Sequence, residues 1–357
     1  MFIQRLLLFL VTSKAFIIEE YFMRRNDCED VVLNSNLVFV EKTVQSLIGC
    51  VAVCLVQPDC ESLNFLPSGS CMLSNTTLDE ACRNGQFYEH GIYMHRHPDK
   101  NITICLNDGI LQSTNTCLCH GGYIGDYCER IMEDCTEGEP YYQGQFGTFL
   151  IHPRLSPNPF KVVCRMAFDK RTYIQIRHYG GNETLFTQNW NAYKNGFGDV
   201  SETNRLERNF WLGNEKIYYL TNSKEYSLII QLVEDRYISF GQYRLDDFLV
   251  KNEANLYAMS YENAYPYRTQ QMVFGDSMAS SKGAKFSTFD KDNDMSEGNC
   301  AELHGAGWWF SDCARCNPNG RLWPGGTNKR LNVSDEFFWE DDLSGSSAWG
   351  TSLWLVR

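Results

Sequence analysis

Three aspartates alternate along one short stretch of the sequence, at Asp290, Asp292 and Asp294. Carboxylates at every second position of a tight loop present several hard oxygen atoms, which suit Ca²⁺ better than a metal that prefers nitrogen or sulfur. An EF-hand that began at Asp290 would need glycine at Met295 and glutamate at Ala301, so that motif is excluded. The stretch therefore predicts either a calcium loop of another type or a solvated acidic turn.

Residues that could carry out catalysis are sparse. The seven histidines are scattered, and no Gly-x-Ser-x-Gly, His-Glu-x-x-His or Walker sequence occurs. His95 and His97 could hold a metal from one strand, or they could form a solvated pair. The acidic run from Glu340 to Asp342 has no partner with which it would form an acid and base pair, which indicates a solvated face. We therefore expect that the protein is not an enzyme.

The cysteines and tryptophans are unevenly distributed along the 357 residues. Ten of the 15 cysteines lie between Cys28 and Cys128, whereas all eight tryptophans lie from Trp190 onward. A first third so small and so rich in cysteine needs disulfides to hold it together, while the remaining chain is long enough to bury an apolar core. The length favours two or three domains. The cysteines favour an oxidising, extracellular compartment over the cytosol.

The net charge and the N-terminal segment bear on partners and localisation. A net charge of −12 argues against nucleic acid, because phosphate binding needs clustered Lys and Arg. Residues 1–15 combine a positive start at Arg5, an apolar run and small residues at the cleavage positions, which is typical of a secretory signal peptide. No stretch reaches the length of a transmembrane helix. Four N-glycosylation sequons agree with a secreted, extracellular protein: Asn75, Asn101, Asn182 and Asn332.

The first cysteine-rich segment contains one helical pattern, from Thr43 to Leu55. Thr43 can cap this helix, and Cys50 and Cys54 lie four residues apart on one face of it. A helix held from one face by two cysteine bridges resembles the PAN/apple family, which we assign to residues 16–98. Some other secreted disulfide module is the alternative. The resemblance implies three disulfides: Cys50–Cys71, Cys54–Cys60 and Cys28–Cys82.

Residues 99–131 carry a second cysteine pattern. Cys117-x-Cys119 is followed by a Gly-aromatic turn at Gly122 and then by Cys128. This order resembles the second half of an EGF-like module, in which two of the six usual cysteines are absent. Those two cysteines pair with each other in the EGF pattern. The acidic residues that calcium-binding EGF-like modules carry are also absent here, so we expect a spacer or contact module and not a metal site. The resemblance implies that two disulfides remain: Cys105–Cys117 and Cys119–Cys128.

The chain from Cys135 onward changes to aromatic-rich strands separated by Gly, Asn and Asp turns, as in an α+β domain with a mostly antiparallel sheet. Five motifs follow in order: FKVVCRMAFD, WNAYKNGFGD, FWLGNEKIYYLT, FSTFDKDNDMSEGNC and GAGWWFSDC. This series resembles the fibrinogen C-terminal domain, which we assign to residues 132–357. The resemblances together predict a multidomain secreted protein with a small disulfide-rich domain, an EGF-like module and a large globular domain.

The resemblance to the fibrinogen C-terminal domain implies a calcium site in the acidic stretch. Asp292 and Asp294 would give carboxylates, while Ser296 and Gly298 would give backbone carbonyls. The family also implies a cis peptide bond at Asn299–Cys300. A cis bond of this kind costs about 3 kcal/mol, so the surrounding structure would have to hold it. Two disulfides are implied in addition: Cys135–Cys164 and Cys300–Cys313.

The recognition pocket of the family would lie beside this calcium site, lined by His304, Cys313 and Ala314. Members that bind acetylated sugars commonly have histidine where this chain has Ala314, whose backbone N–H could still donate to an acetyl oxygen. Cys316 remains after all the other cysteines are assigned to pairs. It is either a buried free thiol or a link between subunits.

These features predict a secreted, calcium-dependent, lectin-like recognition protein. Ca²⁺ would make the loop from Asp292 to Gly298 rigid and preorganise the adjacent pocket for glycans or acetylated ligands. The alternative is a matrix or adhesion protein, or a receptor ligand, in which the same domain presents a protein-binding surface. Ala314 favours that alternative. A homo-oligomer is compatible with the sequence, although no coiled-coil heptad run precedes the domain.

Overall fold

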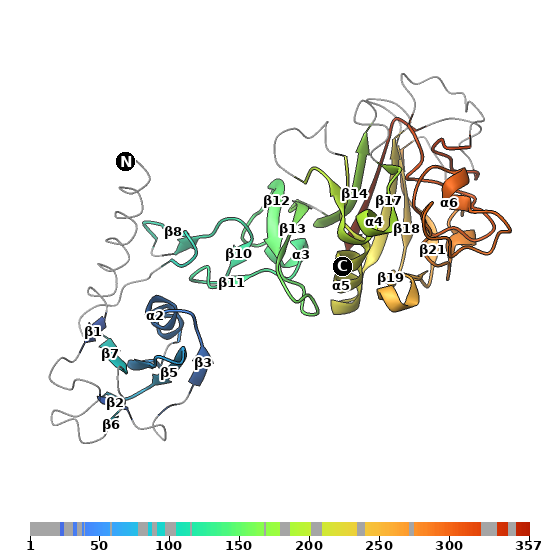
Figure 1. Ribbon diagram of the computed structural model, residues 1–357. Coiled ribbons are helices and arrows are strands. Elements are labelled where there is room, and N and C mark those ends of the chain that lie inside the picture. The colour runs from blue at the N-terminus through green and yellow to red at the C-terminus, as the bar shows by residue number, and fades with distance from the viewer. Residues whose placement is uncertain are drawn as a thin grey trace, which may run out of the picture. The chain divides into compact units, whose positions relative to one another are not determined.

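The structure is a computed structural model of the chain, and it divides into two units (Figure 1). One unit comprises residues 1–119 with 125–129, and the other comprises residues 120–124 with 130–357. The expected signal peptide lies outside the described residues. The structure describes residues 22–24, 31–33, 38, 40–57, 59–77, 85–87, 91–96, 105–114, 116–167, 169–178, 186–200, 209–233, 240–270, 275–322, 334–341 and 348–357.

The first unit is built on a five-stranded antiparallel sheet with the strand order β1-β7-β4-β5-β3. Its strands are β1 (Phe22–Arg24), β3 (Val40–Thr43), β4 (Ser62–Phe65), β5 (Ser70–Ser74) and β7 (Ile92–Arg96). A separate antiparallel pair joins two further strands: β2 (Val31–Leu33) and β6 (Gly85–Phe87). The described part of this unit therefore contains a sheet together with the single helix that the sequence predicts.

Helix α2 (Leu47–Leu55) is the helix of this unit, and it begins later than the sequence suggests. Ser46 caps it, since the Ser46 side chain accepts a hydrogen bond from the Gly49 N–H at 3.2 Å. Thr43 pairs with Ser70 in the ladder between β3 and β5, so its backbone belongs to a strand. The predicted cap at Thr43 is therefore wrong.

Two disulfides attach α2 to the rest of the unit. Cys50 is bonded to Cys71 in β5, and Cys54 is bonded to Cys60 shortly before β4. All four cysteines belong to the buried core of the unit. They are two of the pairs that the PAN/apple resemblance implies, and the assignment of the module to that family stays a prediction. The third implied pair lies outside the described residues: Cys28 and Cys82.

The EGF-like segment spans the division between the units. It contains two disulfides, Cys105–Cys117 and Cys119–Cys128. It also contains two short hairpins: β8 (Ile110–Leu111) with β9 (Cys117–Leu118), and β10 (Tyr123–Ile124) with β11 (Arg130–Ile131). Ile124 and Met132 are buried in the core of the second unit. The Tyr142 hydroxyl donates to the Tyr123 carbonyl at 2.5 Å and accepts from the Gly122 N–H at 3.1 Å. These contacts place the second hairpin in the larger unit.

The second unit is built on a nine-stranded sheet whose registered pairs are all antiparallel. Seven strands follow the order β12-β13-β14-β22-β17-β18-β21, and β16 pairs with both β14 and β15. This arrangement confirms the mostly antiparallel sheet expected from the sequence. The strands are β12 (Phe146–Ile151), β13 (Phe160–Arg165), β14 (Arg171–His178), β15 (Phe197–Gly198), β16 (Phe210–Trp211), β17 (Ser227–Val233), β18 (Phe240–Leu245), β21 (Ala264–Gln270) and β22 (Gly350–Val356).

The helices of the second unit are short and are capped by side chains at several ends. The α-helices are α3 (Cys135–Gly138), α4 (Trp190–Asn195), α5 (Asn214–Ser223) and α6 (Cys300–Leu303), and the 3-10 helices are η4 (Glu253–Asn255) and η5 (Ala279–Ser281). A further hairpin is formed by β19 (Leu249–Val250) and β20 (Met259–Ser260). Asp134, Asn189 and Asn299 each accept a backbone N–H at the start of α3, α4 and α6. Among the described residues, no helix has the length and hydropathy needed to cross a bilayer.

Burial follows the position of each strand in the sheet. The edge strand β12 alternates between buried and partly exposed residues, so one of its faces meets the core. The central strand β22 is buried along its whole length, which its apolar sequence Leu353-Trp354-Leu355-Val356 permits. Its location between β14 and β17 explains why this run reads as nearly continuous rather than alternating.

The aromatic core also fixes the segments that flank the acidic stretch. Trp308 and Trp309 are fully buried, and the Trp309 ring lies 5.2 Å from the ring of Phe286. The Trp309 Nε1 donates to the Tyr257 carbonyl at 2.8 Å. Ser287 forms an antiparallel bridge with Trp308. The chain before the acidic stretch is therefore anchored to the chain after it.

Candidate functional site

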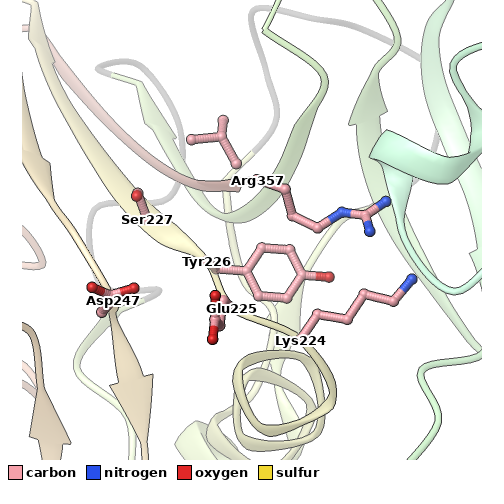
Figure 2. A pocket seen from close by; sticks show the side chains of 7 residues that line it. Lys224, Glu225, Tyr226, Ser227, Asp247 and Arg357 are labelled. Carbon is pink, nitrogen blue, oxygen red and sulfur yellow. The ribbon is translucent and has the colours of Figure 1, made fainter.

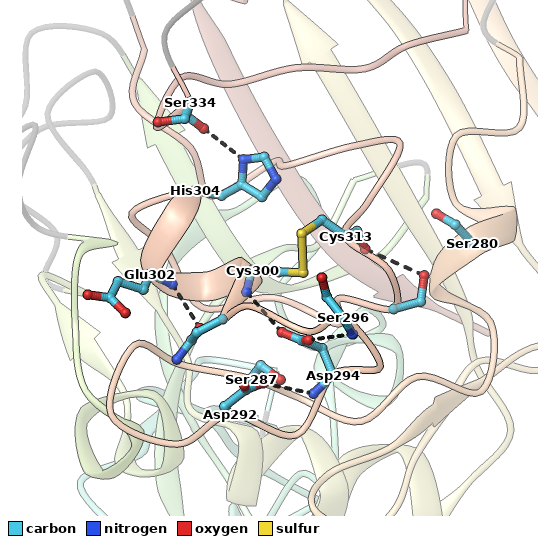
Figure 3. Close-up of a disulfide and its surroundings, with 12 residues drawn as sticks. Ser280, Ser287, Asp292, Asp294, Ser296, Cys300, Glu302, His304, Cys313 and Ser334 are labelled. Carbon is cyan, nitrogen blue, oxygen red and sulfur yellow. Dashed lines mark hydrogen bonds between the residues drawn. A yellow bond between two sulfur atoms is a disulfide. The ribbon is translucent and has the colours of Figure 1, made fainter.

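The acidic stretch forms a loop between Ser287 and helix α6 (Figure 3). Asp294 Oδ1 accepts a hydrogen bond from the Ser296 N–H, and its Oδ2 accepts one from the Cys300 N–H, each at 3.0 Å. Asp292 Oδ1 accepts a hydrogen bond from the Asp294 N–H at 3.1 Å. Successive turns thus hold the carboxylates of Asp292 and Asp294 next to each other.

Asp290 has a different role from Asp292 and Asp294. Its Oδ1 accepts a hydrogen bond from the Thr288 hydroxyl at 2.7 Å and another from the Trp190 N–H at 2.9 Å. It therefore anchors the loop to the first turn of α4. The spacing alone groups Asp290 with the other two aspartates, and no local signal reveals a partner 100 residues away in the sequence.

Asp292 and Asp294 form a pair of like charges. Partial burial raises the pKa of Asp294, and the neighbouring Asp292 raises it further, while the N–H groups of Cys300 and Ser296 act in the opposite direction. A bound cation would offset the repulsion between two adjacent carboxylates. The electrostatics of the loop therefore favour a cation.

The donor groups of the loop fit calcium. Besides Asp292 and Asp294, the carbonyls of Ser296 and Gly298 accept no hydrogen bond from the described residues. Ca²⁺ takes roughly six to eight oxygen ligands and accepts carboxylates, carbonyls and water alike. Among the described residues, no group of three or more His, Cys, Asp or Glu side chains could hold a metal. An ion in this loop would therefore need the carbonyls and water in addition to the two carboxylates.

A disulfide between Cys300 and Cys313 closes the next loop (Figure 3). The Met295 N–H donates to the Ser311 carbonyl at 2.8 Å, and the Ser311 N–H donates to the Cys313 carbonyl at 2.8 Å. Cys300 also begins α6 and donates to Asp294. The acidic loop and the disulfide loop are therefore parts of one hydrogen-bonded unit.

The peptide bond between Asn299 and Cys300 is trans, so the cis bond expected from the family resemblance is wrong for this structure. Asn299 has φ −75° and ψ 105°, and its side chain accepts the Glu302 N–H at 2.9 Å as the cap of α6. In this geometry the Cys300 N–H meets Asp294 Oδ2 at 3.0 Å. The trans bond also avoids the roughly 3 kcal/mol that a non-proline cis bond costs.

His304, which was expected to line a pocket, connects α6 to the segment that begins at Ser334. Its Nδ1 lies 2.7 Å from the Ser334 carbonyl oxygen (Figure 3), and its own carbonyl accepts a hydrogen bond from Asn317 Nδ2 at 3.1 Å. The imidazole ring stacks with Phe310 at 5.5 Å and lies 5.1 Å from the ring of Phe338. These contacts fix the orientation of the imidazole ring.

Cys313 and Ala314, the other two expected pocket residues, are partly buried and pack against the core. Among the described residues, none accepts a hydrogen bond from the Ala314 N–H. Residues 323–333 lie outside the described residues. The disulfide bonds Cys300, at the start of α6, to Cys313. It therefore connects the helix that precedes His304 to the segment that contains Ala314.

Three large apolar side chains around the acidic loop are exposed, and the sequence reasoning missed them. Phe289 is 46% exposed, Met295 is 77% exposed and Leu303 is 52% exposed. Asn299 joins two of them, because its Nδ2 donates to the Phe289 carbonyl at 3.0 Å and its carbonyl accepts the Leu303 N–H at 3.0 Å. We call the surface formed by Phe289, Met295 and Leu303 the loop face. The signal in the sequence was an apolar residue on each side of the run of aspartates.

Cys316 is a free and fully buried cysteine. Burial raises the pKa of its thiol well above the usual range, and its Sγ lies 3.4 Å from Met278 Sδ. A thiol without access to solvent cannot reach a second subunit. Of the two alternatives left open by the sequence, the structure supports the buried free thiol.

A shallow cavity of about 620 Å³ lies at the start of β17 (Figure 2). The polar ends of Lys224, Tyr226 and Arg357 point to the same side of it (Figure 2). Arg357 Nε lies 3.1 Å from Asp134 Oδ2, and Lys224 Nζ lies 2.8 Å from Glu133 Oε2. The Tyr226 hydroxyl donates to Asp134 Oδ2 at 2.5 Å. Because these groups pair within the protein, they form a structural junction between the start of β17, the end of β22 and the start of α3.

The acidic run near the chain end is not a fully solvated face, which corrects the expectation from the sequence. Arg315 Nε lies 3.4 Å from Glu340 Oε2, and Arg315 also forms an ion pair with Asp341. The Asp341 N–H donates to the Ser277 hydroxyl at 2.9 Å. Asp342 lies outside the described residues. The run therefore helps to hold neighbouring loops together, through partners that are distant in the sequence.

Other expected sites fall partly outside the described residues. His97 is outside them, so a metal site with His95 stays untested. Asn75 is exposed directly after β5, where a glycan would meet no steric obstacle from a buried environment. The remaining sequons lie outside the described residues: Asn101, Asn182 and Asn332.

The second unit combines a mostly antiparallel sheet, a disulfide from Cys135 to Cys164, and an acidic loop bonded to the loop that Cys300 and Cys313 close. These features define a globular domain of the fibrinogen-like class. A sequence model of the family described as "Fibrinogen beta and gamma chains, C-terminal globular domain" matches residues 131–347. The chain belongs to this family.

Comparisons with known proteins agree with this membership. The fibrinogen gamma chain of Petromyzon marinus is 35% identical over 208 residues, which cover 55% of this chain and 46% of the relative. Human angiopoietin-related protein 1 is 32% identical over 222 residues, which cover 61% of this chain and 42% of the relative. The chain thus spans about half the length of these curated relatives.

Solved structures give a similar result. Lamprey fibrin D-dimer, complexed with the peptide Gly-His-Arg-Pro-amide, matches with a TM-score of 0.55 and 29% identity. The match covers 63% of this chain and 73% of the other chain. The family match is confined to residues 131–347, so the PAN/apple-like and EGF-like assignments stay predictions.

Proposed function

We propose that this protein is an extracellular recognition protein whose fibrinogen-like domain binds a protein or peptide partner at the loop face. The observation that carries the proposal is the exposure of Phe289, Met295 and Leu303 around one hydrogen-bonded pair of loops. Exposed apolar surface is typical of protein interaction sites, and these three side chains belong to the two loops that the hydrogen bonds join. The peptide complex of lamprey fibrin D-dimer supports the same kind of ligand.

Calcium has a supporting role in this proposal. Asp292, Asp294 and the carbonyls of Ser296 and Gly298 would hold the ion, which supplies positive charge between the two carboxylates. The hydrogen bond from Met295 to Ser311 connects this loop to the disulfide loop. A loop held in one conformation loses less entropy on binding a partner, so calcium is expected to strengthen binding.

A second candidate function is binding of glycans or acetylated ligands by the same domain. The specific observation in its favour is the Ala314 N–H, which has no acceptor among the described residues and could donate to an acetyl oxygen. The absence of a histidine side chain at Ala314 and the fixed orientation of His304 both favour the protein or peptide partner instead. We therefore rank the glycan function second.

The wider context of the proposal is a secreted protein that is not an enzyme. Six disulfides among the described residues suit an oxidising compartment, and they occur in both units. The N-terminal module and the EGF-like module would then act as a spacer or as additional contact surfaces.

The test is a comparison of two arrays probed with the full chain, one of extracellular proteins and one of glycans that include acetylated sugars. Each array is probed in calcium and again in EDTA. The proposal predicts protein binders whose signal falls in EDTA, and it is contradicted if only glycans bind. Binding that is equally strong in EDTA would contradict the role assigned to calcium.

A further inference from the structure

Met295 is the most exposed large apolar side chain among the described residues. It is 77% exposed, whereas the six other methionines whose side chains the structure describes are each at most 6% exposed: Met72, Met94, Met132, Met166, Met259 and Met278. An oxidant dissolved in water reaches a thioether only where the side chain meets solvent. Among these seven methionines, the folded chain therefore presents only Met295 to such an oxidant.

The backbone of Met295 is anchored, although its side chain is open to solvent. Its N–H donates to the Ser311 carbonyl at 2.8 Å. The residues on either side of it are joined as well, because Asp294 Oδ1 accepts the Ser296 N–H at 3.0 Å (Figure 3). None of these bonds involves the sulfur atom. A change at the Met295 sulfur therefore leaves these hydrogen bonds of the loop in place.

The thioether of Met295 is an apolar part of the loop face. The other two members, Phe289 and Leu303, have hydrocarbon side chains. Oxidation converts the thioether of methionine into a sulfoxide, which is polar. A polar group that a partner covers without supplying a hydrogen bond costs free energy, because its hydration is lost. Oxidation of Met295 therefore changes the loop face at one defined point and opposes contact with an apolar partner.

We propose that Met295 is an oxidation site through which peroxides weaken the binding of a partner to the loop face. The sulfur lone pair forms an S–O bond while the O–O bond of hydrogen peroxide breaks. The proton of the transferred oxygen passes to the departing hydroxide, so one water molecule leaves, and the two electrons that the sulfur loses reduce the peroxide. The effect on binding rests on the proposed function of the loop face, whereas the oxidation of Met295 does not.

The first test maps the oxidation by hydrogen peroxide. The full chain in calcium is treated for increasing times and digested, and mass spectrometry follows the gain of one oxygen atom in each methionine peptide. We expect Met295 to oxidise about tenfold faster than the six buried methionines, because burial protects them. The same treatment in guanidinium chloride, which unfolds the chain, should bring the seven rates close together. Equal rates in the folded chain would overturn the site.

The second test compares affinities for the strongest binder from the extracellular protein array, by surface plasmon resonance before peroxide treatment and after it, once catalase has removed the peroxide. The native chain is expected to lose affinity by about tenfold. Met295→Leu keeps an apolar side chain of similar volume and has no sulfur, so it should bind like the untreated native chain and lose no affinity in peroxide. Met259→Leu is the matched control, since it removes a buried thioether and should stay as sensitive as the native chain.

The proposal is overturned if peroxide leaves the affinity of the native chain unchanged, or if Met295→Leu loses as much affinity as the native chain. Calcium should raise the Tm of the oxidised chain as much as that of the untreated chain. A smaller rise would place the effect in the calcium loop and overturn its assignment to the loop face. If no protein on the array binds the untreated chain, the proposed function is wrong and the control of binding fails with it, and the peroxide map alone decides the oxidation site.

Discussion

Asp134 is a fully buried carboxylate that joins the start of the fibrinogen-like domain to its last strand. It accepts a hydrogen bond from the Glu137 N–H at 2.8 Å as the cap of α3. Its other oxygen accepts the Tyr226 hydroxyl and pairs with Arg357. The pKa of Tyr226 is raised by burial and by the adjacent Asp134 charge, so its hydroxyl stays protonated and remains a donor.

Replacement of this residue, Asp134→Ala, is expected to lower the free energy of unfolding by about 3 kcal/mol, because it leaves partners of a buried ion pair without a counter-charge. Urea denaturation monitored by tryptophan fluorescence measures the loss. Asp312→Ala is the control, since Asp312 is exposed in the same unit. Equal stability of the two variants would show that the junction does not stabilise the domain.

Cys316 gives a second prediction about a single residue. Since burial raises the pKa of its thiol, the group stays protonated and unreactive at pH 7 to 9 while the domain is folded. In the native protein, Ellman's reagent is expected not to react with Cys316. After denaturation, the native sequence is expected to show one more reactive thiol than the denatured Cys316→Ala variant. Rapid labelling of native protein, or a covalent dimer, that disappears in Cys316→Ala would contradict this account.

His178 gives the prediction on pH. Burial lowers the pKa of its imidazole below the usual value of 6.5, so below pH 6.5 the unfolded chain binds a proton that the native domain does not. Its contribution to stability is therefore present above pH 6.5 and is lost as the pH falls toward the lower folded value. We expect His178→Gln to reduce the loss of stability between pH 7.5 and pH 5.5 by about 1 kcal/mol. The exposed His120, replaced by Gln, serves as the control.

At the scale of elements, the acidic loop is the part of the site that the sequence predicted best. Alternating carboxylates require only the local chain, so spacing singles out the run of Asp290, Asp292 and Asp294 but not the different role of Asp290. The exposure of Met295 and the anchoring of Asp290 by Trp190 depend on segments that are distant in the sequence. Local pattern therefore identifies the acidic loop as a candidate cation site, whereas the surface around it needs the folded structure.

Calcium is expected to stabilise the fibrinogen-like domain through this loop. At a calcium concentration one hundred times the Kd, binding adds about 2.7 kcal/mol to the free energy of unfolding. Differential scanning calorimetry should show a higher Tm in calcium than in EDTA, and Asp294→Asn should abolish most of the difference. Glu297→Gln is the control, because it removes one negative charge from an exposed position of the same loop. This variant should keep the Tm difference between calcium and EDTA. A Tm that does not respond to calcium would refute the site.

The ends of the helices also depend on contacts that the local sequence does not reveal. The apolar spacing and the cysteines predicted α2 correctly, but its cap moved from Thr43 to Ser46 because Thr43 pairs with a strand. The trans bond at Asn299–Cys300 likewise depends on a side chain that caps α6 and on the contact with Asp294. Competition of this kind between a strand, a cap and a turn is decided by tertiary contacts.

At the scale of the whole molecule, cysteine density and aromatic content separated a disulfide-rich first part from a large second domain. The structure also has two units, and the division runs through the EGF-like segment because Ile124 and Met132 are buried in the second core. Cysteine spacing alone does not reveal such a contact. The ordered motifs from Cys135 onward identified the family, since a series of landmarks is more specific than any single one.

The central claim is that the loop face of the fibrinogen-like domain binds a protein or peptide partner. The most direct measurement is the affinity of the full chain for the strongest binder from the extracellular protein array, by surface plasmon resonance in calcium. The double variant Phe289→Ser with Met295→Ser is expected to lose about 2 kcal/mol, roughly thirtyfold in Kd, as for residues at the centre of an interface. Leu155→Ser, at a residue 47% exposed in the same domain, should bind like the native chain. Undiminished binding by the double variant would contradict the claim.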